Sequence, residues 1–295
     1  RNQWMENRLA VAQQLQEVAC TIQKISCDVS EVTSCSQKME DQIRTQLAKH
    51  HIQVKQIWML SRVDEKWKIF MTMCMRSGQC MTMREIGRQL SVVCKKNMVP
   101  SKESRSILNG DTKTCIFVED VNYKVLYGVS KITKERETVS GDNYICTSTD
   151  EQYILCLSDG MGSGIEACRE SETVVDLMEQ FLLAGFSRET AAKMVNATLI
   201  LHRKNGMFSS IDLCVMNLYT GICEILKVGA AATFIRRDTS VEMILSESMP
   251  AGLTPQLDFE ITNKKLYDGD YVIMVTDGVL DALGQENQEK LMKEI

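Results

Sequence analysis

The first third of this chain lacks the two residues that most often interrupt helices: glycine first occurs at Gly78 and proline at Pro100. Within residues 1–50, apolar side chains recur at alternating intervals of four and three, and only Ser36 interrupts the series with a polar residue. The series comprises Val11, Leu15, Val18, Ile22, Ile25, Val29, Val32, Met39 and Ile43. This heptad spacing predicts a long helix over residues 1–50, which we interpret as a regulatory linker. Its apolar seam would either form a homo-oligomer or pack on its own chain.

Histidine is also scarce and occurs only at His50, His51 and His202. A catalytic triad that depends on histidine, or a zinc site rich in histidine, is therefore poorly supplied. The chain has no G-x-x-x-x-G-K-[ST] loop and no G-x-G-x-x-G segment after a strand-like run. The usual signs of a nucleotide-binding enzyme are therefore missing.

The chain has neither an excess of positive charge nor a long apolar run. Its net charge of -5 and pI near 5.5 argue against a nucleic-acid partner, because no basic surface dominates. No apolar run reaches the roughly 18 residues that a membrane span needs. The sequence begins with Arg1 instead of methionine, so we expect a fragment, and any membrane segment would lie upstream.

Twelve cysteines are present, but none of them forms a C-x-x-C pair. Several, including Cys146, Cys156 and Cys214, lie inside apolar strand-like runs. We therefore interpret them as reduced cysteines that act as small hydrophobic residues, and not as disulfides or zinc ligands. Reduced cysteines predict a reducing compartment.

Residues 51–108 have the pattern of a small α/β regulatory unit. From Trp67 to Met75 every second residue is apolar, which is typical of one face of a strand. The sequence from Thr82 to Glu85 fits a capping box that opens a helix, and this helix should end before Pro100. The row of methionines on the strand would serve either as a binding surface or, as we prefer, as part of the core.

Strand-like runs dominate the remainder, residues 109–295. The runs 114–120 and 123–132 lie on either side of a short turn and predict a hairpin. Two helices are expected at 166–184 and 188–201, and further strand-like runs follow them. Strand hairpins that enclose a single pair of helices indicate an antiparallel α+β domain and not a repeated βαβ arrangement.

Two Asp-Gly pairs, Asp159-Gly160 and Asp277-Gly278, each follow a strongly apolar run. Such a pair places a carboxylate on a turn at the end of a buried strand. Two carboxylates of this kind bind one hard cation such as Mg²⁺ or Mn²⁺ if their strands lie side by side. A single Asp-Gly pair is commonly only a turn, but a third acidic turn ending at Asp142 favours a functional site.

Five segments of the chain resemble one known family. SGDNY, LSDGMGSG, SSIDLCVMNL, LKVGAAATFIRR and VTDGVLDA occur in the same order and at similar spacing in the sporulation stage II E serine phosphatases of the metal-dependent PPM/PP2C superfamily. The resemblance implies an α+β fold: an α/β/β/α antiparallel sandwich phosphatase domain over residues 109–295, preceded by the small α/β unit and the long helical linker. It also implies the cytoplasmic domain of a bacterial inner-membrane protein whose membrane-spanning region lies upstream.

The resemblance also implies roles for individual residues. Asp159 matches the aspartate that bridges two Mn²⁺ or Mg²⁺ ions, Gly160 would add its carbonyl oxygen, and Asp277 matches a ligand of the first ion. Asp142 resembles the acidic residue near the second ion. The reaction implied is hydrolysis of phosphoserine by metal-activated water without a phosphoenzyme. The family's protein substrate is a phosphorylated anti-sigma-factor antagonist, and its dephosphorylation releases a sporulation sigma factor.

The chain departs from the family in one respect. The family has a further G-x-x-D-D-M-T motif in a final strand, and this sequence stops at Ile295 without it. We therefore expect a C-terminally incomplete sandwich that is inactive or poor in metal, unless the difference reflects only the extent of this piece. The alternative function is a non-catalytic, phosphatase-like scaffold that self-associates through residues 1–50. In the enzyme, we expect the N-terminal helix to regulate the site by shifting the helices between residues 166 and 201.

Overall fold

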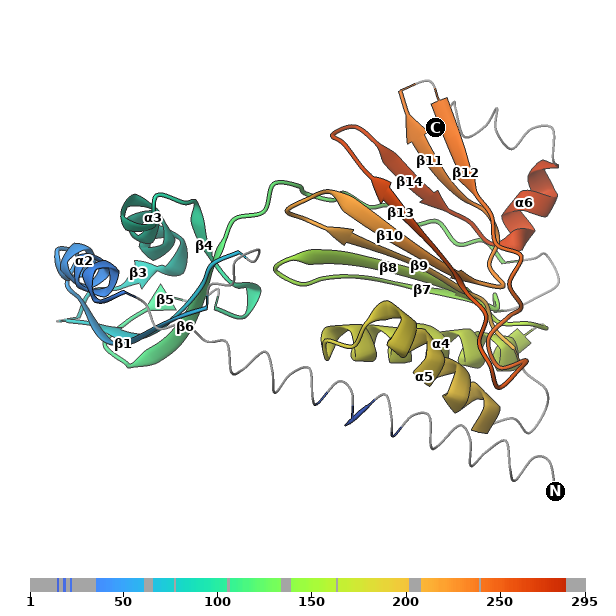
Figure 1. Ribbon diagram of the computed structural model, residues 1–295, viewed down its shortest axis with the longest axis horizontal. Coiled ribbons are helices and arrows are strands. Elements are labelled where there is room, and N and C mark those ends of the chain that lie inside the picture. The colour runs from blue at the N-terminus through green and yellow to red at the C-terminus, as the bar shows by residue number, and fades with distance from the viewer. Residues whose placement is uncertain are drawn as a thin grey trace. The chain divides into compact units, whose positions relative to one another are not determined.

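A computed structural model describes Leu15, Val18, Ala19 and Ile22 and most of the chain from Ser36 to Gly284. The continuous ranges are 36–60, 66–76, 78–104, 107–133, 139–162, 164–201, 208–238 and 240–284. The chain divides into two compact units between Val121 and Asn122 (Figure 1). Each unit has its own hydrophobic core. None of the helices in the described ranges is both long and apolar enough to span a membrane.

The first unit is built on an antiparallel four-stranded sheet with the order β1-β2-β6-β4. Its strands and helices are α2 (Gln37–Ala48), β1 (Ile52–Leu60), β2 (Lys68–Met75), β3 (Met81–Thr82), α3 (Met83–Cys94), β4 (Met98–Pro100), a 3-10 turn (Lys102–Ser104), β5 (Ile107–Leu108) and β6 (Lys113–Glu119). The short strands β3 and β5 form a separate pair. This arrangement agrees with the small α/β unit predicted from the sequence.

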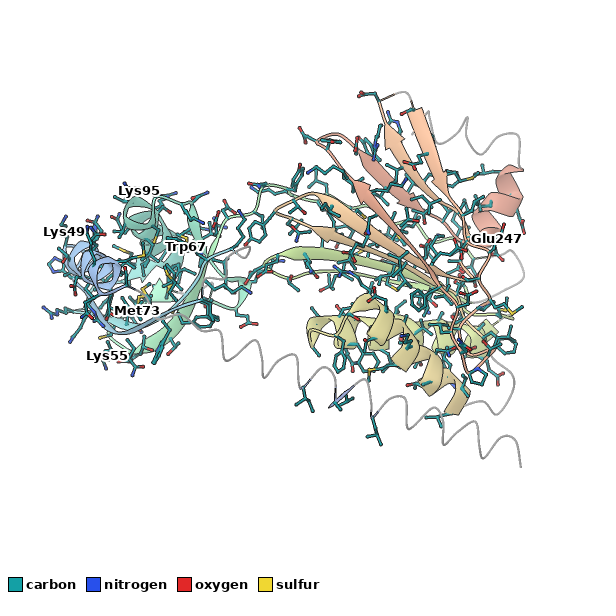
Figure 2. The ribbon with its side chains drawn as sticks, viewed as in Figure 1. Lys49, Lys55, Trp67, Met73, Lys95 and Glu247 are labelled. Carbon is teal, nitrogen blue, oxygen red and sulfur yellow. The ribbon has the colours of Figure 1, made fainter. Side chains whose placement is uncertain are left out.

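The core of the first unit confirms two details of the sequence analysis. Every second residue of β2 is buried, and Met71 and Met73 are fully buried, so the methionine row packs inside the unit (Figure 2). The capping box that opens α3 is present: the hydroxyl of Thr82 accepts a hydrogen bond from the Glu85 amide at 3.3 Å, and the Glu85 carboxylate accepts one from the Thr82 amide at 3.0 Å.

The hairpin predicted for residues 114–120 and 123–132 is wrong. Strand β6 pairs with β2 on one side and with β4 on the other, whereas residues 121–133 form no strand. The physical reason is burial: Cys115 and Phe117 lie in the core of the first unit, which requires β6 to pair within that sheet. The first unit therefore continues to Val121, beyond the boundary that the sequence placed before residue 109.

A single helix over residues 1–50 is also not observed. Helix α2 begins at Gln37, and Ser36 before it has an extended backbone with φ -62° and ψ 136°. The last apolar residues of the predicted seam, such as Ile43, are buried in the first unit's own core. Leu15, Val18, Ala19 and Ile22 are helical, with Leu15 and Ile22 largely exposed, and the rest of the seam lies outside the described residues. Self-association therefore stays a prediction.

The second unit contains two antiparallel sheets and three helices among the residues that the structure describes. One sheet has the order β13-β10-β9-β8-β7 and the other the order β12-β11-β14. The elements are β7 (Asp142–Ser148), β8 (Gln152–Asp159), α4 (Gly164–Leu183), α5 (Arg188–Leu201), β9 (Ile211–Asn217), β10 (Ile222–Val228), β11 (Thr233–Arg237), β12 (Ser240–Ile244), β13 (Glu260–Lys265), β14 (Tyr271–Met274) and α6 (Asp277–Leu283). The two helices predicted between residues 166 and 201 are confirmed as α4 and α5.

These elements form four layers (Figure 1). Helices α4 and α5 cover one face of the five-stranded sheet, where Val174 packs with Leu213 in one cluster. The opposite face packs against the three-stranded sheet in a second cluster that includes Ile225 and Ile235. Helix α6 packs through Leu280 on the outer face of the three-stranded sheet. The predicted α/β/β/α antiparallel sandwich is therefore confirmed.

Candidate metal centre

Two of the predicted site residues face each other at the end of one strand pair. Asp142 is the first residue of β7, Asp159 is the last residue of β8, and the two are register partners in the antiparallel ladder. Directly opposite residues in such a ladder have Cβ atoms about 5 Å apart on the same face of the sheet. The sheet therefore brings these two carboxylates together.

Asp277 reaches the same place from the other sheet. It is the first residue of α6, and Thr276 before it is the N-cap residue, with φ -86° and ψ 165°. The Thr276 hydroxyl donates a hydrogen bond to Oδ2 of Asp142 at 3.3 Å. The start of α6 therefore lies beside the start of β7, and the carboxyl groups of Asp142 and Asp277 both lie near enough to Asp159 to affect its pKa.

The convergence of these groups has a clear electrostatic consequence. Burial, followed by the nearby carboxyl groups of Asp142 and Asp277, raises the pKa of Asp159 to about 8. Like charges at close range disfavour each other's ionised form, and a cation between them reverses that effect. Carboxylate oxygens are also the ligands that Mg²⁺ and Mn²⁺ prefer. The donor set therefore fits a hard divalent cation.

The cluster is a convergence of acids and not a finished coordination shell. In the described part of the chain, no three His, Cys, Asp or Glu side chains already form a group able to enclose a metal ion. Backbone carbonyls and water commonly complete the shell of a hard cation. The carbonyl oxygen of Gly160 lies close to Gly141, directly before Asp142, so it is available near the cluster.

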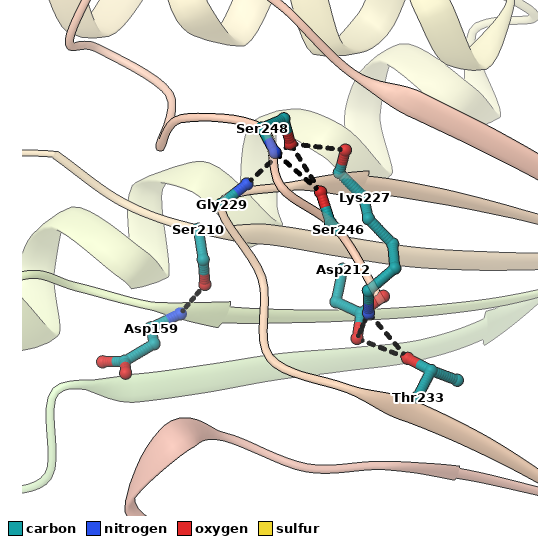
Figure 3. Close-up of polar contacts among 8 residues, drawn as sticks. All are labelled: Asp159, Ser210, Asp212, Lys227, Gly229, Thr233, Ser246 and Ser248. Atoms are coloured by element: carbon teal, nitrogen blue, oxygen red, sulfur yellow. Dashed lines mark hydrogen bonds and ion pairs between the residues drawn. The ribbon is translucent and has the colours of Figure 1, made fainter. Parts of the chain in front are cut away.

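Serine side chains hold the backbone of Asp159 in place, and Figure 3 shows the contact with Ser210. The Ser210 hydroxyl accepts a hydrogen bond from the Asp159 amide at 2.9 Å, and the Ser209 hydroxyl donates one to the Asp159 carbonyl at 2.9 Å. Ser209 is fully buried and also contacts the Ser158 hydroxyl at 2.7 Å. Because both peptide groups of Asp159 are bound, the direction of its side chain is set by the start of β9.

Glycine is required at one of the two Asp-Gly pairs and not at the other. A Cβ atom at Gly160 would lie 2.1 Å from the carbonyl oxygen of Ala167, in the first turns of α4. A Cβ atom at Gly278 would meet no atom within 4 Å, since Gly278 is simply the second residue of α6. The sequence presented these pairs as equivalent turns, but only the first permits close approach of a helix.

Helix α4 is bound to the turn that carries Asp142. The Ser171 hydroxyl donates a hydrogen bond to the carbonyl of Gly141. The side-chain amide of Asn143 donates to the Ser171 hydroxyl at 2.9 Å and to the Cys168 carbonyl at 2.8 Å. A displacement of α4 would therefore be transmitted to the Asp142 turn.

Sequence reasoning assigned no role to a buried polar network beside this site. The ammonium group of Lys227 lies 2.6 Å from Oδ2 of Asp212 and 2.8 Å from the hydroxyl of Thr233, which itself donates to Asp212 at 2.7 Å. These side chains are at most 2 % exposed. Burial raises the pKa of Asp212 and lowers that of Lys227, and each partner's charge opposes the change. The sequence did contain a signal: Asp212 and Lys227 are charged residues within apolar strand-like runs, and a charged side chain must find a partner when it is buried.

Comparisons with known proteins agree with this geometry. Residues 149–295 match the family model described as stage II sporulation protein E. The chain is 28% identical to stage II sporulation protein E of Bacillus subtilis (strain 168) over 290 residues, which are 98% of this chain and 35% of the relative. It is 28% identical to stage II sporulation protein E of Priestia megaterium over 298 residues, 99% of this chain and 50% of the relative. The chain thus spans between one third and one half of these curated relatives.

A solved structure with a similar fold covers both units. It contains the PP2C phosphatase domain and a fragment of the regulatory domain of the cell fate determinant SpoIIE from Bacillus subtilis. The similarity has a TM-score of 0.63 and 26% sequence identity, and it covers 100% of this chain and 87% of the solved chain. The sandwich that carries Asp142, Asp159 and Asp277 is thus of the PP2C type.

Proposed function

Because the chain belongs to the stage II sporulation protein E family, we propose that it is a metal-dependent protein-serine/threonine phosphatase that hydrolyses phosphoserine. The observation that carries this proposal is the convergence of Asp142, Asp159 and Asp277 from both sheets of the sandwich. A cluster of acids with one strongly raised pKa is unfavourable for stability by itself, and such clusters are typical of functional sites.

The residues that would hold two Mn²⁺ or Mg²⁺ ions are Asp142, Asp159, Asp277 and the carbonyl of Gly160. When bound, such ions lower the pKa of coordinated water and stabilise negative charge on phosphoryl oxygens. The protein's part is to hold its carboxylates in position. Asp159 is fixed through the hydrogen bonds of its backbone to Ser209 and Ser210, as described above.

Hydrogen bonds also orient the carboxylate of Asp142. Its Oδ2 atom accepts from the hydroxyl of Ser140 at 3.2 Å and from that of Thr276 at 3.3 Å. Fixed orientation of this kind reduces the reorganisation that a reaction would otherwise require. In the proposed reaction, water displaces serine from the phosphoserine monoester and releases inorganic phosphate without a phosphoenzyme.

We further propose the substrate, regulation and setting that the family suggests. The substrate would be the phosphoserine form of an anti-sigma-factor antagonist during sporulation. The N-terminal helix would regulate the site, and the bonds from Ser171 and Asn143 give α4 a direct connection to the Asp142 turn. The chain would act in the cytoplasm as part of a membrane-anchored protein, with homo-oligomer formation through residues 1–50.

Phosphate release from a phosphoserine protein tests the proposal. On a chain extended to carry the family's G-x-x-D-D-M-T motif, we expect release with Mn²⁺, none with a chelator, and none from Asp159→Asn. Asp176→Asn is the matched control, because it removes the same charge from an exposed position on α4. Equal release from the wild type and Asp159→Asn, or release that persists with chelator, would contradict the proposed reaction.

The exposed side chains of Leu15 and Ile22 favour a second candidate function, a non-catalytic scaffold that self-associates. The scaffold predicts association that depends on protein concentration, without Mn²⁺ binding and without phosphate release. Because the proposed enzyme also forms a homo-oligomer, Mn²⁺ binding and phosphate release by the associated protein distinguish the two, since only the enzyme requires the ion.

A further inference from the structure

The network of Asp212, Lys227 and Thr233, called the inter-sheet network below, joins the two sheets of the sandwich. Asp212 lies on β9 and Lys227 on β10, both in the five-stranded sheet, whereas Thr233 is the first residue of β11 in the three-stranded sheet. Around it, the interface between the sheets is apolar, with residues such as Ile225 and Ile235. Apolar contact is non-directional, so it sets the spacing of two sheets better than their alignment.

On the side of the five-stranded sheet, the network leads to Asp159. Asp212 follows Ser210 by two residues on the same chain segment and is the register partner of Leu157 on β8. Ser210 in turn binds the Asp159 amide (Figure 3). A change in the position of Asp212 therefore moves the serine pair that fixes the Asp159 backbone.

On the side of the three-stranded sheet, the network leads to Asp277. Thr233 is the register partner of Met274, the last residue of β14. The chain continues through Thr276 to Asp277, and the Thr276 hydroxyl binds Asp142, the ladder partner of Asp159. The contacts therefore form a closed circuit through both sheets: Asp142 and Asp159 lie on it, and Asp277 directly follows its member Thr276.

Backbone groups of Lys227 and Gly229, next to the network, fix a loop near Asp159. The Ser248 hydroxyl donates to the Lys227 carbonyl at 3.3 Å and accepts from the Gly229 amide at 3.1 Å. Farther along this loop, Ala251 exchanges two backbone hydrogen bonds with Ser209 at 2.9 and 3.1 Å. The start of β9 is thus held from two sides: the Lys227 ammonium group binds Asp212 on β9, and the loop beside the Lys227 backbone binds Ser209.

We propose that the inter-sheet network positions Asp159 relative to Asp277 and thereby sets the affinity of the centre for its metal ions. Its members touch neither ion nor substrate, so they are positioning residues, and the inference rests on the proposed function. Burying a charged pair generally offers less stability than a well-packed apolar group of the same size, whereas hydrogen bonds in a dry interior fix geometry closely. A role in fixing the position of Asp159 relative to Asp277 accounts for the buried pair of Asp212 and Lys227 between the two sheets.

The test compares three variants of the protein by direct measurement of Mn²⁺ binding, using the electron paramagnetic resonance signal of free Mn²⁺. Thr233→Val removes the hydroxyl and keeps the shape, whereas Thr233→Ser keeps the hydroxyl. Ile225→Val, in the same interface, controls for lost packing. We expect Thr233→Val to weaken Mn²⁺ binding about tenfold, as removal of groups that orient metal ligands generally does. Thr233→Ser and Ile225→Val should bind like the wild type.

The outcomes separate this inference from the proposed function. If the wild type binds no Mn²⁺ even when the chain is extended to carry the G-x-x-D-D-M-T motif, the proposed function fails. If the wild type binds Mn²⁺ and Thr233→Val binds it as tightly as Ile225→Val does, only the inference fails. Should Thr233→Val not fold, the double variant Asp212→Leu with Lys227→Met replaces the pair by apolar groups of similar size. Weak Mn²⁺ binding by this folded double variant supports the inference, and binding like that of the wild type overturns it.

Discussion

Replacement of Asp159 by asparagine should make the metal-free protein more stable at pH 8, although it removes the central residue of the site. In the folded protein the pKa of Asp159 is raised to about 8, from an ordinary value of 3.8. The folded state therefore holds the proton more tightly than the unfolded state. This carboxyl group contributes its full stabilisation below pH 4, and the contribution is lost as the pH rises through 8.

The magnitude follows from the same values. At about 1.4 kcal/mol per pH unit, the difference would correspond to roughly 5–6 kcal/mol. Asp159 is only partly buried, so solvent screening reduces the effect, and we expect a gain of about 1–3 kcal/mol for Asp159→Asn at pH 8. At pH 4 the two proteins should have nearly the same free energy of unfolding, because the aspartate is then protonated in the folded state.

Urea denaturation at pH 4 and pH 8, with chelator present, measures this difference. Asp176→Asn again controls for the loss of one charge and should follow the wild type. Adding Mn²⁺ at pH 8 should reverse the order, because a ligand that binds only the folded state stabilises it by mass action. The reasoning is refuted if Asp159→Asn is less stable than the wild type at pH 8 without metal. It is also refuted if the free energy of unfolding of the variant falls between pH 4 and pH 8 as steeply as that of the wild type.

Three further predictions concern stability. Lys227→Met should lower the free energy of unfolding by about 3–5 kcal/mol in urea denaturation, because it leaves Asp212 buried without a cation. Adding Asp212→Leu should restore most of this loss, and a double variant as unstable as Lys227→Met would contradict the prediction. Gly160→Ala should lower the free energy of unfolding by about 1–3 kcal/mol through the clash with α4, whereas Gly278→Ala should not lower it. Equal melting temperatures of these two variants would contradict the requirement for glycine at position 160. Burial raises the pKa of Glu170 to about 7, and its Oε2 atom has no partner among the described residues. Glu170→Gln should therefore gain about 1–2 kcal/mol at pH 8 and nothing at pH 4 in the same denaturation experiment, and a loss at pH 8 would contradict the assignment.

Local patterns predicted those elements whose structure depends on nearby residues. The capping box from Thr82 to Glu85 and the alternation along β2 each reflect one segment and its own burial, and both are confirmed. The hairpin at residues 114–132 was wrong because alternation shows that a strand has a buried face but does not show which strand it pairs with. The pairing of β6 with β2 and β4 is a long-range choice, made by burying Phe117 in the first unit.

The candidate site likewise combines features that depend on nearby residues, which the sequence predicted, with features that depend on long-range contacts, which it did not. The acids at the ends of apolar runs were visible in the sequence, and the fold brings Asp142, Asp159 and Asp277 together. Their support was not visible, because the bonds of Ser210 to Asp159 and of Thr276 to Asp142 depend on ladder register and on contact between two sheets. The difference between Gly160 and Gly278 likewise depends on how closely α4 approaches one of them.

The most direct test of the account is the number of Mn²⁺ ions bound per chain, measured by the resonance signal of free Mn²⁺ in wild type and Asp159→Asn. If Asp159 is the residue shared by two ions, the wild type on a chain extended to carry the G-x-x-D-D-M-T motif should bind two ions, and the variant should lose both at the same Mn²⁺ concentration. A wild type that binds none, or a variant that binds as many ions as the wild type, would contradict the assignment of this carboxylate cluster as the metal centre of a phosphatase.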